Sequence, residues 1–441
     1  MCEGGQQEQV SQVHAALTFQ ERFYWAIHNK DSGLYRLDPF SFLITGELDR
    51  EYLQRSVDAL INRHEVLRTR FSMVDGGLRH RVDERVECPV VIKEVGDTGQ
   101  SKATECAEQF IQEVADRTHD LSVGPLFNVA LIKLTGREQI LVFGIHHLLF
   151  DAVTIDILFR EFWLRYAQFI LGYEPKVQRV SVRYAEYRLW QEKTHRLWVE
   201  RHRHYWVSRL SGGAAIEWPG VVKNATGHQQ ECVSAVERSF GETLSAEVHS
   251  SARRLRTSVS LELLAAYAAV ISQLNHQRDF IVGTMWNGRD HAEHSDIAGY
   301  LAHPLYLRVQ MSGEETFRQL LENVSTEFRN ALVHKDFGGV CTETMDLFGG
   351  TLFQWMPASE LGVRLGTIAP GVDVKWFLFK GRMNFPEKFK LILYVHEQKN
   401  DIGVYVRFRP QFIAGELVER LLIDLEAMLR RLVRNPHARI A

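Results

Sequence analysis

The sequence has few cysteines, and nothing in their arrangement suggests a structural role. The five cysteines, Cys2, Cys88, Cys106, Cys232 and Cys341, are scattered and form no CxxC or other short pair. An odd number of widely spaced cysteines indicates reduced thiols rather than a disulfide framework or a zinc site. We therefore expect a cytoplasmic protein without a bound metal.

The chain also lacks a long apolar run and an excess of charge. Its first residues, MCEGGQQEQVSQ, are polar and do not resemble a signal peptide. The most apolar helical stretch, LELLAAYAAVISQL from Leu261, is too short to span a bilayer and contains Glu262. The formal net charge of -3 gives no electrostatic reason to bind nucleic acid or an anionic membrane. We expect neither as a partner.

Motifs of several common enzyme classes are missing as well. The sequence contains no GxSxG elbow, no Walker loop, no GxGxxG and no HExxH. Covalent serine catalysis, nucleotide hydrolysis, dinucleotide binding and zinc proteolysis therefore have no support.

The stretch GIHHLLFDAVT, from Gly144 to Thr154, is the strongest candidate for a functional site. Residues 139–145 before the histidines are apolar and predict a buried strand, and a mostly buried helix follows Asp151. If the strand alternation continues, His147 and His146 lie on opposite faces, so they are poor joint ligands for one metal. Two interpretations remain open: a core histidine with a helix-capping aspartate, or a single catalytic imidazole.

The length of 441 residues predicts two domains. Residues 1–14 are expected to be a disordered lead-in, residues 15–210 one lobe, residues 211–232 a linker rich in glycine, and residues 233–441 a second lobe. Strands alternate with helices in both halves, which indicates an α/β or α+β protein. Alternation of Phe389, Leu391, Leu393 and Val395 before the turn KNDIG predicts a hairpin with residues 404–408.

A neutral imidazole can accept a proton from an attacking amine or alcohol, or orient that group by hydrogen bonding. His147 is the candidate for this role. We expect Asp151 to hold the turn that presents His147, paired with an arginine from another element. Arg63 and Arg68, in the stretch RHEVLR, are the candidates for that partner.

The stretch HHLLFDA resembles the HHxxxDG signature of the condensation domains of nonribosomal peptide synthetases, which is shared with chloramphenicol acetyltransferase. Further stretches are similar to other motifs of that family, in the same order along nearly the whole chain. They are LTFQERFYW from Leu17, RHEVLRTRF from Arg63, RYAEYRLW from Arg183, GYLAHPLYLR from Gly299 and VHKDF from Val333.

The resemblance implies a V-shaped pseudodimer of two acetyltransferase-like lobes, with His147 midway along a tunnel between them. It implies that His147 is catalytic, as base or as positioner of the nucleophile, and that His146 and Asp151 are structural. The donor would be an acyl thioester on the phosphopantetheine arm of a carrier protein, and no cofactor would be bound permanently. An amine or alcohol acceptor would give an amide or an ester.

The sequence departs from the family pattern near the expected tunnel. Ala152 replaces the glycine that ends the signature, and His303 followed by Pro304 replaces an asparagine segment. His303 is either an acceptor contact or a packed strand histidine. Trp286 and Asn287 are candidates for lining the tunnel, with a packing role as the alternative.

The chain contains no carrier segment with an attachment serine and no adenylation motif. We therefore expect it to meet its carrier protein in trans. Two alternatives are an acyltransferase of the same fold that uses acyl-coenzyme A, and a non-catalytic protein that recruits a partner enzyme.

Overall fold

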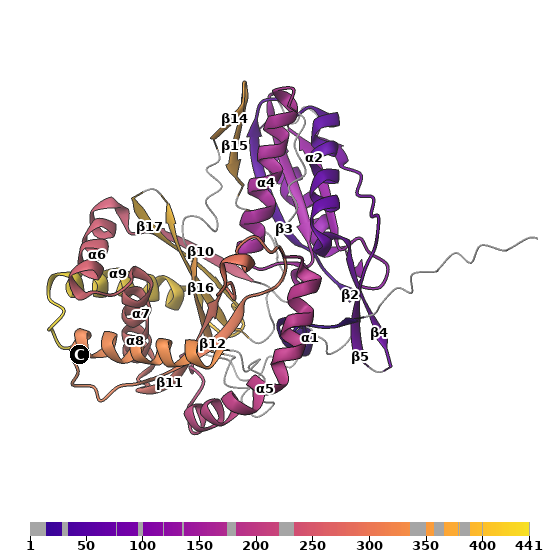
Figure 1. The fold of residues 1–441 in the computed structure, drawn as a ribbon. Helices are drawn as coiled ribbons and strands as arrows, with labels where there is room; N and C mark the ends of the chain where they lie inside the picture. Colours follow the sequence, from indigo (N-terminus) through magenta and orange to yellow (C-terminus); the bar gives the residue numbers. More distant parts are fainter. Residues whose placement is uncertain are drawn as a thin grey trace, which may run out of the picture.

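A computed structural model gives the fold (Figure 1). It describes residues 15–28, 34–75, 77–95, 100–117, 119–134, 136–173, 182–219, 233–335, 350–356, 366–377, 379, 389–398 and 400–440. The expected lead-in of residues 1–14 lies outside the described residues.

The N-terminal lobe is built on a six-stranded sheet with the order β14-β15-β3-β9-β8-β6. Its strands are β3 (Asp38–Thr45), β6 (Val91–Glu94), β8 (Phe127–Lys133), β9 (Glu138–Ile145), β14 (Gly366–Ala369) and β15 (Val372–Trp376). The central strands β3, β9 and β8 pair antiparallel, so the apolar run of residues 139–145 is an inner strand as predicted. Side chains of β9 are buried on both faces of the sheet.

Helices cover the two faces of this sheet. The helices α2 (Arg50–Arg63) and α4 (Ala152–Ile170) pack together, and their apolar side chains share one core with Leu141 and Phe143. The helix α3 (Gln100–Asp116) packs against the opposite face, over Ile140 and Val142. The lobe also contains α1 (Phe19–His28), the 3-10 turn η1 (Glu65–Arg68) and the short strands β1 (Ala15–Ala16), β2 (Leu34–Tyr35), β4 (Thr69–Val74), β5 (Gly77–Val82) and β7 (His119–Asp120).

The C-terminal lobe repeats this plan with another six-stranded sheet, in the order β10-β17-β16-β13-β11-β12. Its strands are β10 (Ser234–Ser239), β11 (Asp279–Trp286), β12 (His303–Gln310), β13 (Thr351–Met356), β16 (Leu391–Gln398) and β17 (Asp401–Phe408). The predicted hairpin is confirmed, because β16 and β17 pair antiparallel around the turn. The helices α6 (Gly241–Leu255), α7 (Val259–Asn275), α8 (Phe317–Val333) and α9 (Gly415–Arg434) lie together beside this sheet (Figure 1).

The two lobes are connected by more than one crossing of the chain. The 27-residue helix α5 (Tyr184–Leu210) runs from one lobe toward the other (Figure 1). The strands β14 and β15 come from the C-terminal half of the sequence but extend the N-terminal sheet, where Asp373 is paired with Thr45. The expected α/β architecture of two similar lobes is confirmed. The sequence did not predict that β14 and β15 would join the N-terminal sheet.

The segment expected to be a linker is partly described. In residues 211–219 the side chains of Ile216 and Trp218 are buried in the core of the C-terminal lobe, and Trp218 Nε1 donates to the carbonyl of Gly350 at 3.2 Å. Residues 220–232 lie outside the described residues. Among the described helices, none is both long and apolar enough to cross a bilayer alone; α6 and α7 pass that test only as a pair bent by 103°.

Candidate active site at the junction of the lobes

The two adjacent histidines lie just beyond the end of β9. The strand ends at Ile145, His146 caps a single 3-10 turn, and His147 is the first residue of that turn, η2 (His147–Leu149). The strand alternation therefore does not continue through the two histidines, because the pleat ends at Ile145. The turn still separates the two rings, as the sequence led us to expect.

The environments of His146 and His147 differ sharply. His146 is fully buried, and its Nδ1 accepts a hydrogen bond from the backbone N–H of Leu148 at 3.2 Å. In contrast, 33% of the His147 side chain is exposed. Only the second ring is therefore accessible to a reactant, while the first stabilises the turn.

The described side chains that contact the ring of His147 include Asp38, Phe150 and Tyr300. Its Nδ1 lies 3.1 Å from Oδ2 of Asp38, the first residue of β3. The rings of Phe150 and Tyr300 approach it edge-on, with centroid distances of 4.6 and 5.6 Å. Burial raises the pKa of the Tyr300 hydroxyl, with a smaller contribution from the charge of Asp151, so this phenol stays neutral at physiological pH.

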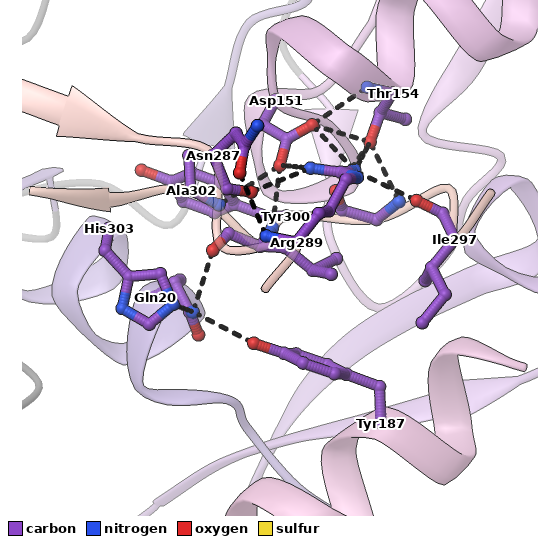
Figure 2. A network of polar contacts seen from close by, with 12 residues as sticks. Gln20, Asp151, Thr154, Tyr187, Asn287, Arg289, Ile297, Tyr300, Ala302 and His303 are labelled. Atoms are coloured by element: carbon purple, nitrogen blue, oxygen red, sulfur yellow. Dashed lines mark hydrogen bonds and ion pairs between the residues drawn. The ribbon is translucent and has the colours of Figure 1, made fainter. Parts of the chain in front are cut away.

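Asp151 is both the cap of α4 and a link between the lobes. Its Oδ1 accepts from the backbone N–H and the hydroxyl of Thr154, both at 2.8 Å. Its Oδ2 accepts from the backbone N–H groups of Leu301 and Ala302, at 2.9 and 3.1 Å. Figure 2 shows how these groups converge on the carboxylate together with Arg289.

The arginine that pairs with Asp151 is Arg289, from the loop after β11 in the C-terminal lobe. Its Nη1 lies 2.8 Å from Oδ2 and its Nη2 lies 3.1 Å from Oδ1. Both side chains are almost fully buried. The predicted role of Asp151 as an anchor fits this geometry, but the prediction of Arg63 or Arg68 as its partner is wrong.

Arg63 and Arg68 have other partners within the N-terminal lobe. Nε of Arg63 lies 2.9 Å from Oε2 of Glu161 on α4, and His64 lies 2.8 Å from the same oxygen. Burial disfavours the charge of Glu161, but hydrogen bonds and charges from His64 and Arg165 prevail and lower its pKa to about 2. Arg68 donates to the carbonyls of Ile61, Asp83 and Glu84. Arg63 therefore ties α2 to α4, and Arg68 ties η1 to the carbonyls of neighbouring segments.

The three residues expected near a tunnel have distinct positions. His303 is 3% exposed, its ring meets Phe19 edge-on at 4.7 Å, and its Nε2 lies 3.1 Å from Nε2 of Gln20 (Figure 2). The packing alternative is therefore the one that the structure supports for His303. Asn287 accepts from the backbone N–H of Arg289 at 3.0 Å and thereby positions the arginine.

Trp286 is half-buried, and its Nε1 donates to Oδ1 of Asp290 at 2.9 Å. Lining of a tunnel by Trp286 and Asn287 stays a prediction. The motif around Val333 is described only as far as Lys335, whose Nζ lies 3.4 Å from Asp290, so the remainder of that motif lies outside the described residues.

A second polar network ties α1 to both lobes. The side-chain amide of Gln20, which is fully buried, donates to the carbonyl of Leu301 at 3.0 Å and to the hydroxyl of Tyr187 at 3.3 Å. Beside it, the buried Arg188 forms an ion pair with Glu21. Sequence reasoning noted these motifs but did not predict their contacts.

The arrangement can carry out proton transfer at one imidazole. Across the part of the chain that the structure describes, no group of three His, Cys, Asp or Glu side chains is placed to hold a metal ion. What the described site presents is one accessible ring, a carboxylate at its Nδ1, and a buried ion pair that fixes the adjacent turn.

The chain resembles known proteins over most of its length. Residues 10–340 match the family model described as "Condensation domain". Tyrocidine synthase 2 of Brevibacillus parabrevis is 30% identical over 440 residues, which make up 95% of this chain and 11% of that protein. The chain therefore spans only a small part of the length of this relative.

Solved structures show the same fold. The X-domain from teicoplanin biosynthesis has a TM-score of 0.81 at 17% identity, covering 99% of this chain and 98% of that one. That X-domain has also been solved in complex with OxyB. SgcC5 from Streptomyces globisporus, solved with a naphthyl ethanediol, has a TM-score of 0.77 at 20% identity, covering 96% of this chain and 100% of that one.

Proposed function

The chain belongs to the condensation domain family, and from this premise we propose that it transfers an acyl group from a carrier-protein thioester to an amine or alcohol. The observation that carries the proposal is the contrast between the two histidines of the signature. His147 is one-third exposed at the junction of the lobes, whereas His146 is fully buried.

In the proposed reaction His147 acts on the proton of the acceptor. The acceptor nitrogen or oxygen forms a bond to the thioester carbon while its proton passes to the imidazole. The carbon–sulfur bond then breaks, and the proton passes from the imidazolium to the departing thiolate of the phosphopantetheine arm. The products are an amide or ester and a free thiol, so no oxidant or metal is required.

The proposed donor is bound only transiently. The phosphopantetheine arm belongs to an acyl or peptidyl carrier protein. The acceptor is a small amine or alcohol. Exclusion of water by the two lobes would protect the thioester from hydrolysis and hold the two reactants together.

Product formation with a panel of loaded carrier proteins, measured by mass spectrometry, tests this proposal. We expect His147→Ala to lower the transfer rate by roughly 100-fold or more. The matched control is His204→Ala, because His204 is an exposed histidine on α5. This variant is expected to keep the wild-type rate.

Two other outcomes would replace the proposal. Equal rates with acyl-coenzyme A and with the loaded carrier would indicate an acyltransferase that needs no carrier. No transfer by the wild type with any donor, combined with stable binding of a partner enzyme, would indicate a recruiting protein. The complex of the teicoplanin X-domain with OxyB is an instance of such binding in a protein of the same fold.

A further inference from the structure

The carboxylate at Nδ1 of His147 is placed by the register of the N-terminal sheet. In the antiparallel pair of β3 and β9, Asp38 is directly opposite Ile145, the last residue of β9. His147 follows two residues later, which brings its ring over the first residue of the neighbouring strand. The 3.1 Å contact between Nδ1 and Oδ2 therefore joins two groups that are both anchored to the centre of one sheet.

The Asp38 carboxylate is shielded from water and has few partners that can compensate its negative charge. Only 10% of its side chain is exposed, and a shielded carboxylate requires a compensating donor or cation. Within the described part of the chain, His147 is the basic side chain that contacts it, and no lysine or arginine there forms an ion pair with it.

The charge of Asp38 also acts on a group of the C-terminal lobe. Tyr394 on β16 has a hydroxyl whose pKa is raised, mainly by burial and in smaller part by the negative charge of Asp38. Arg407 on β17 acts in the opposite direction on the same hydroxyl, through its charge and a hydrogen bond. The charge of Asp38 therefore acts on groups of both lobes, on His147 in its own sheet and on Tyr394 in the C-terminal lobe.

An ionised carboxylate only accepts hydrogen bonds, so the proton in this contact belongs to the imidazole. We infer that Asp38 is a positioning residue that holds neutral His147 in the tautomer protonated at Nδ1. In this tautomer the lone pair is on Nε2, which is the atom that takes the proton of the acceptor. When Nε2 accepts that proton, the carboxylate stabilises the imidazolium, and this contribution is greatest when the acceptor attacks.

The inference rests on the proposed function and assigns His147 the role of general base. If His147 only oriented the acceptor by hydrogen bonding, no imidazolium would form. Asp38 would then affect the rate only through the tautomer of His147, and the loss of its charge would have a smaller effect on kcat. The two roles therefore differ in their response to Asp38→Asn, which keeps the size of the side chain but removes its charge.

The first test is a direct observation of the tautomer in the full chain. Nitrogen NMR of protein labelled with ¹⁵N-histidine distinguishes Nδ1–H from Nε2–H, and comparison with His147→Ala identifies the signals of His147. We expect the Nδ1–H tautomer in the wild type and loss of this preference in Asp38→Ala. The Nε2–H tautomer in the wild type would overturn the inference, whatever the behaviour of the variants.

The second test separates kcat from KM. We expect Asp38→Asn to lower kcat by roughly 10- to 100-fold with little change in KM for the acceptor. The matched control is Asp58→Asn, because Asp58 is an exposed aspartate on α2 that accepts from Gln54. An unchanged kcat in Asp38→Asn, in a protein where His147→Ala abolishes transfer, would also overturn the inference.

The failure of the proposed function would be recognised separately. Full transfer by His147→Ala would remove His147 from the reaction, without reference to Asp38. The NMR measurement of the His147 tautomer in the wild type would then be the remaining test of whether Asp38 positions the ring.

Discussion

Arg289 extends from the C-terminal lobe to Asp151 in the N-terminal lobe, and its guanidinium contacts both oxygens of that carboxylate, at 2.8 and 3.1 Å. The same guanidinium donates to the carbonyl of Ile297 and to the hydroxyl of Thr154. The ion pair is therefore part of a buried network that fixes the turn bearing His147 against the opposite lobe. Both oxygens of the Asp151 carboxylate are thus held by groups of the protein itself.

Removal of Arg289 should be one of the most damaging single changes in the chain. In Arg289→Leu the Asp151 carboxylate stays buried without its cation, and we expect a loss of about 3 to 5 kcal/mol in the free energy of unfolding. Urea denaturation measures this loss. Arg420→Leu removes an exposed arginine that pairs with Asp424 four residues away on α9, and its stability should remain close to that of the wild type. Equal stability of the two variants would contradict the role assigned to Arg289.

Gly288, just before Arg289, should not tolerate a side chain. Its φ is +70°, and a Cβ built there would lie 2.0 Å from the carbonyl oxygen of Leu301. We expect Gly288→Ala to destabilise the chain by about 2 to 4 kcal/mol, from backbone strain and overpacking together, as measured by urea denaturation.

Gly241 provides the control for Gly288. It has a φ of +76°, but a Cβ there would meet nothing within 4 Å. Gly241→Ala should therefore show the cost of the backbone conformation alone, about 1 kcal/mol. If the two alanine variants lose the same stability, the close approach of Gly288 to Leu301 is not what restricts the loop.

Local patterns in the sequence predicted the elements that present the site. The apolar run of residues 139–145 and the alternation from Phe389 to Val395 correspond to β9 and β16, because a side-chain period of two is a property of the strand itself. The cap at Asp151 was also predictable, since an aspartate before an apolar helical pattern satisfies the first backbone N–H groups.

Contacts between distant segments were not predictable in the same way. Arg289 is 138 residues from Asp151 and lies outside the stretches that resemble family motifs, whereas Arg63 and Arg68 belong to one of them, RHEVLR. Asp38 is 109 residues from His147, and no motif in the sequence links the two. The available signal was its place at the start of a strand that neighbours β9, but this depends on knowing the strand order. Likewise, nothing in the sequence indicates that β14 and β15 join the N-terminal sheet.

A carboxyl group in the C-terminal core should make stability depend on pH. Glu262, in the first turn of α7, is fully buried. Burial raises its pKa from 4.5 to about 7, against smaller opposing effects of the nearby Ser251 hydroxyl and the charge of Arg254. Between pH 4.5 and 7 the folded chain therefore keeps a proton that the unfolded chain has lost.

The contribution of Glu262 to stability is therefore complete below about pH 4.5 and is lost as the pH rises to about 7. We expect this loss to be at most about 3 kcal/mol, and to be absent from Glu262→Gln, which has no titrating group. Urea denaturation of both proteins at several pH values between 5 and 8 measures the difference. Glu242→Gln is the matched control, because Glu242 is an exposed glutamate in the first turn of α6 and should leave the wild-type pH dependence in place. If Glu262→Gln retains the full pH dependence of the wild type, the buried carboxyl group is not its source.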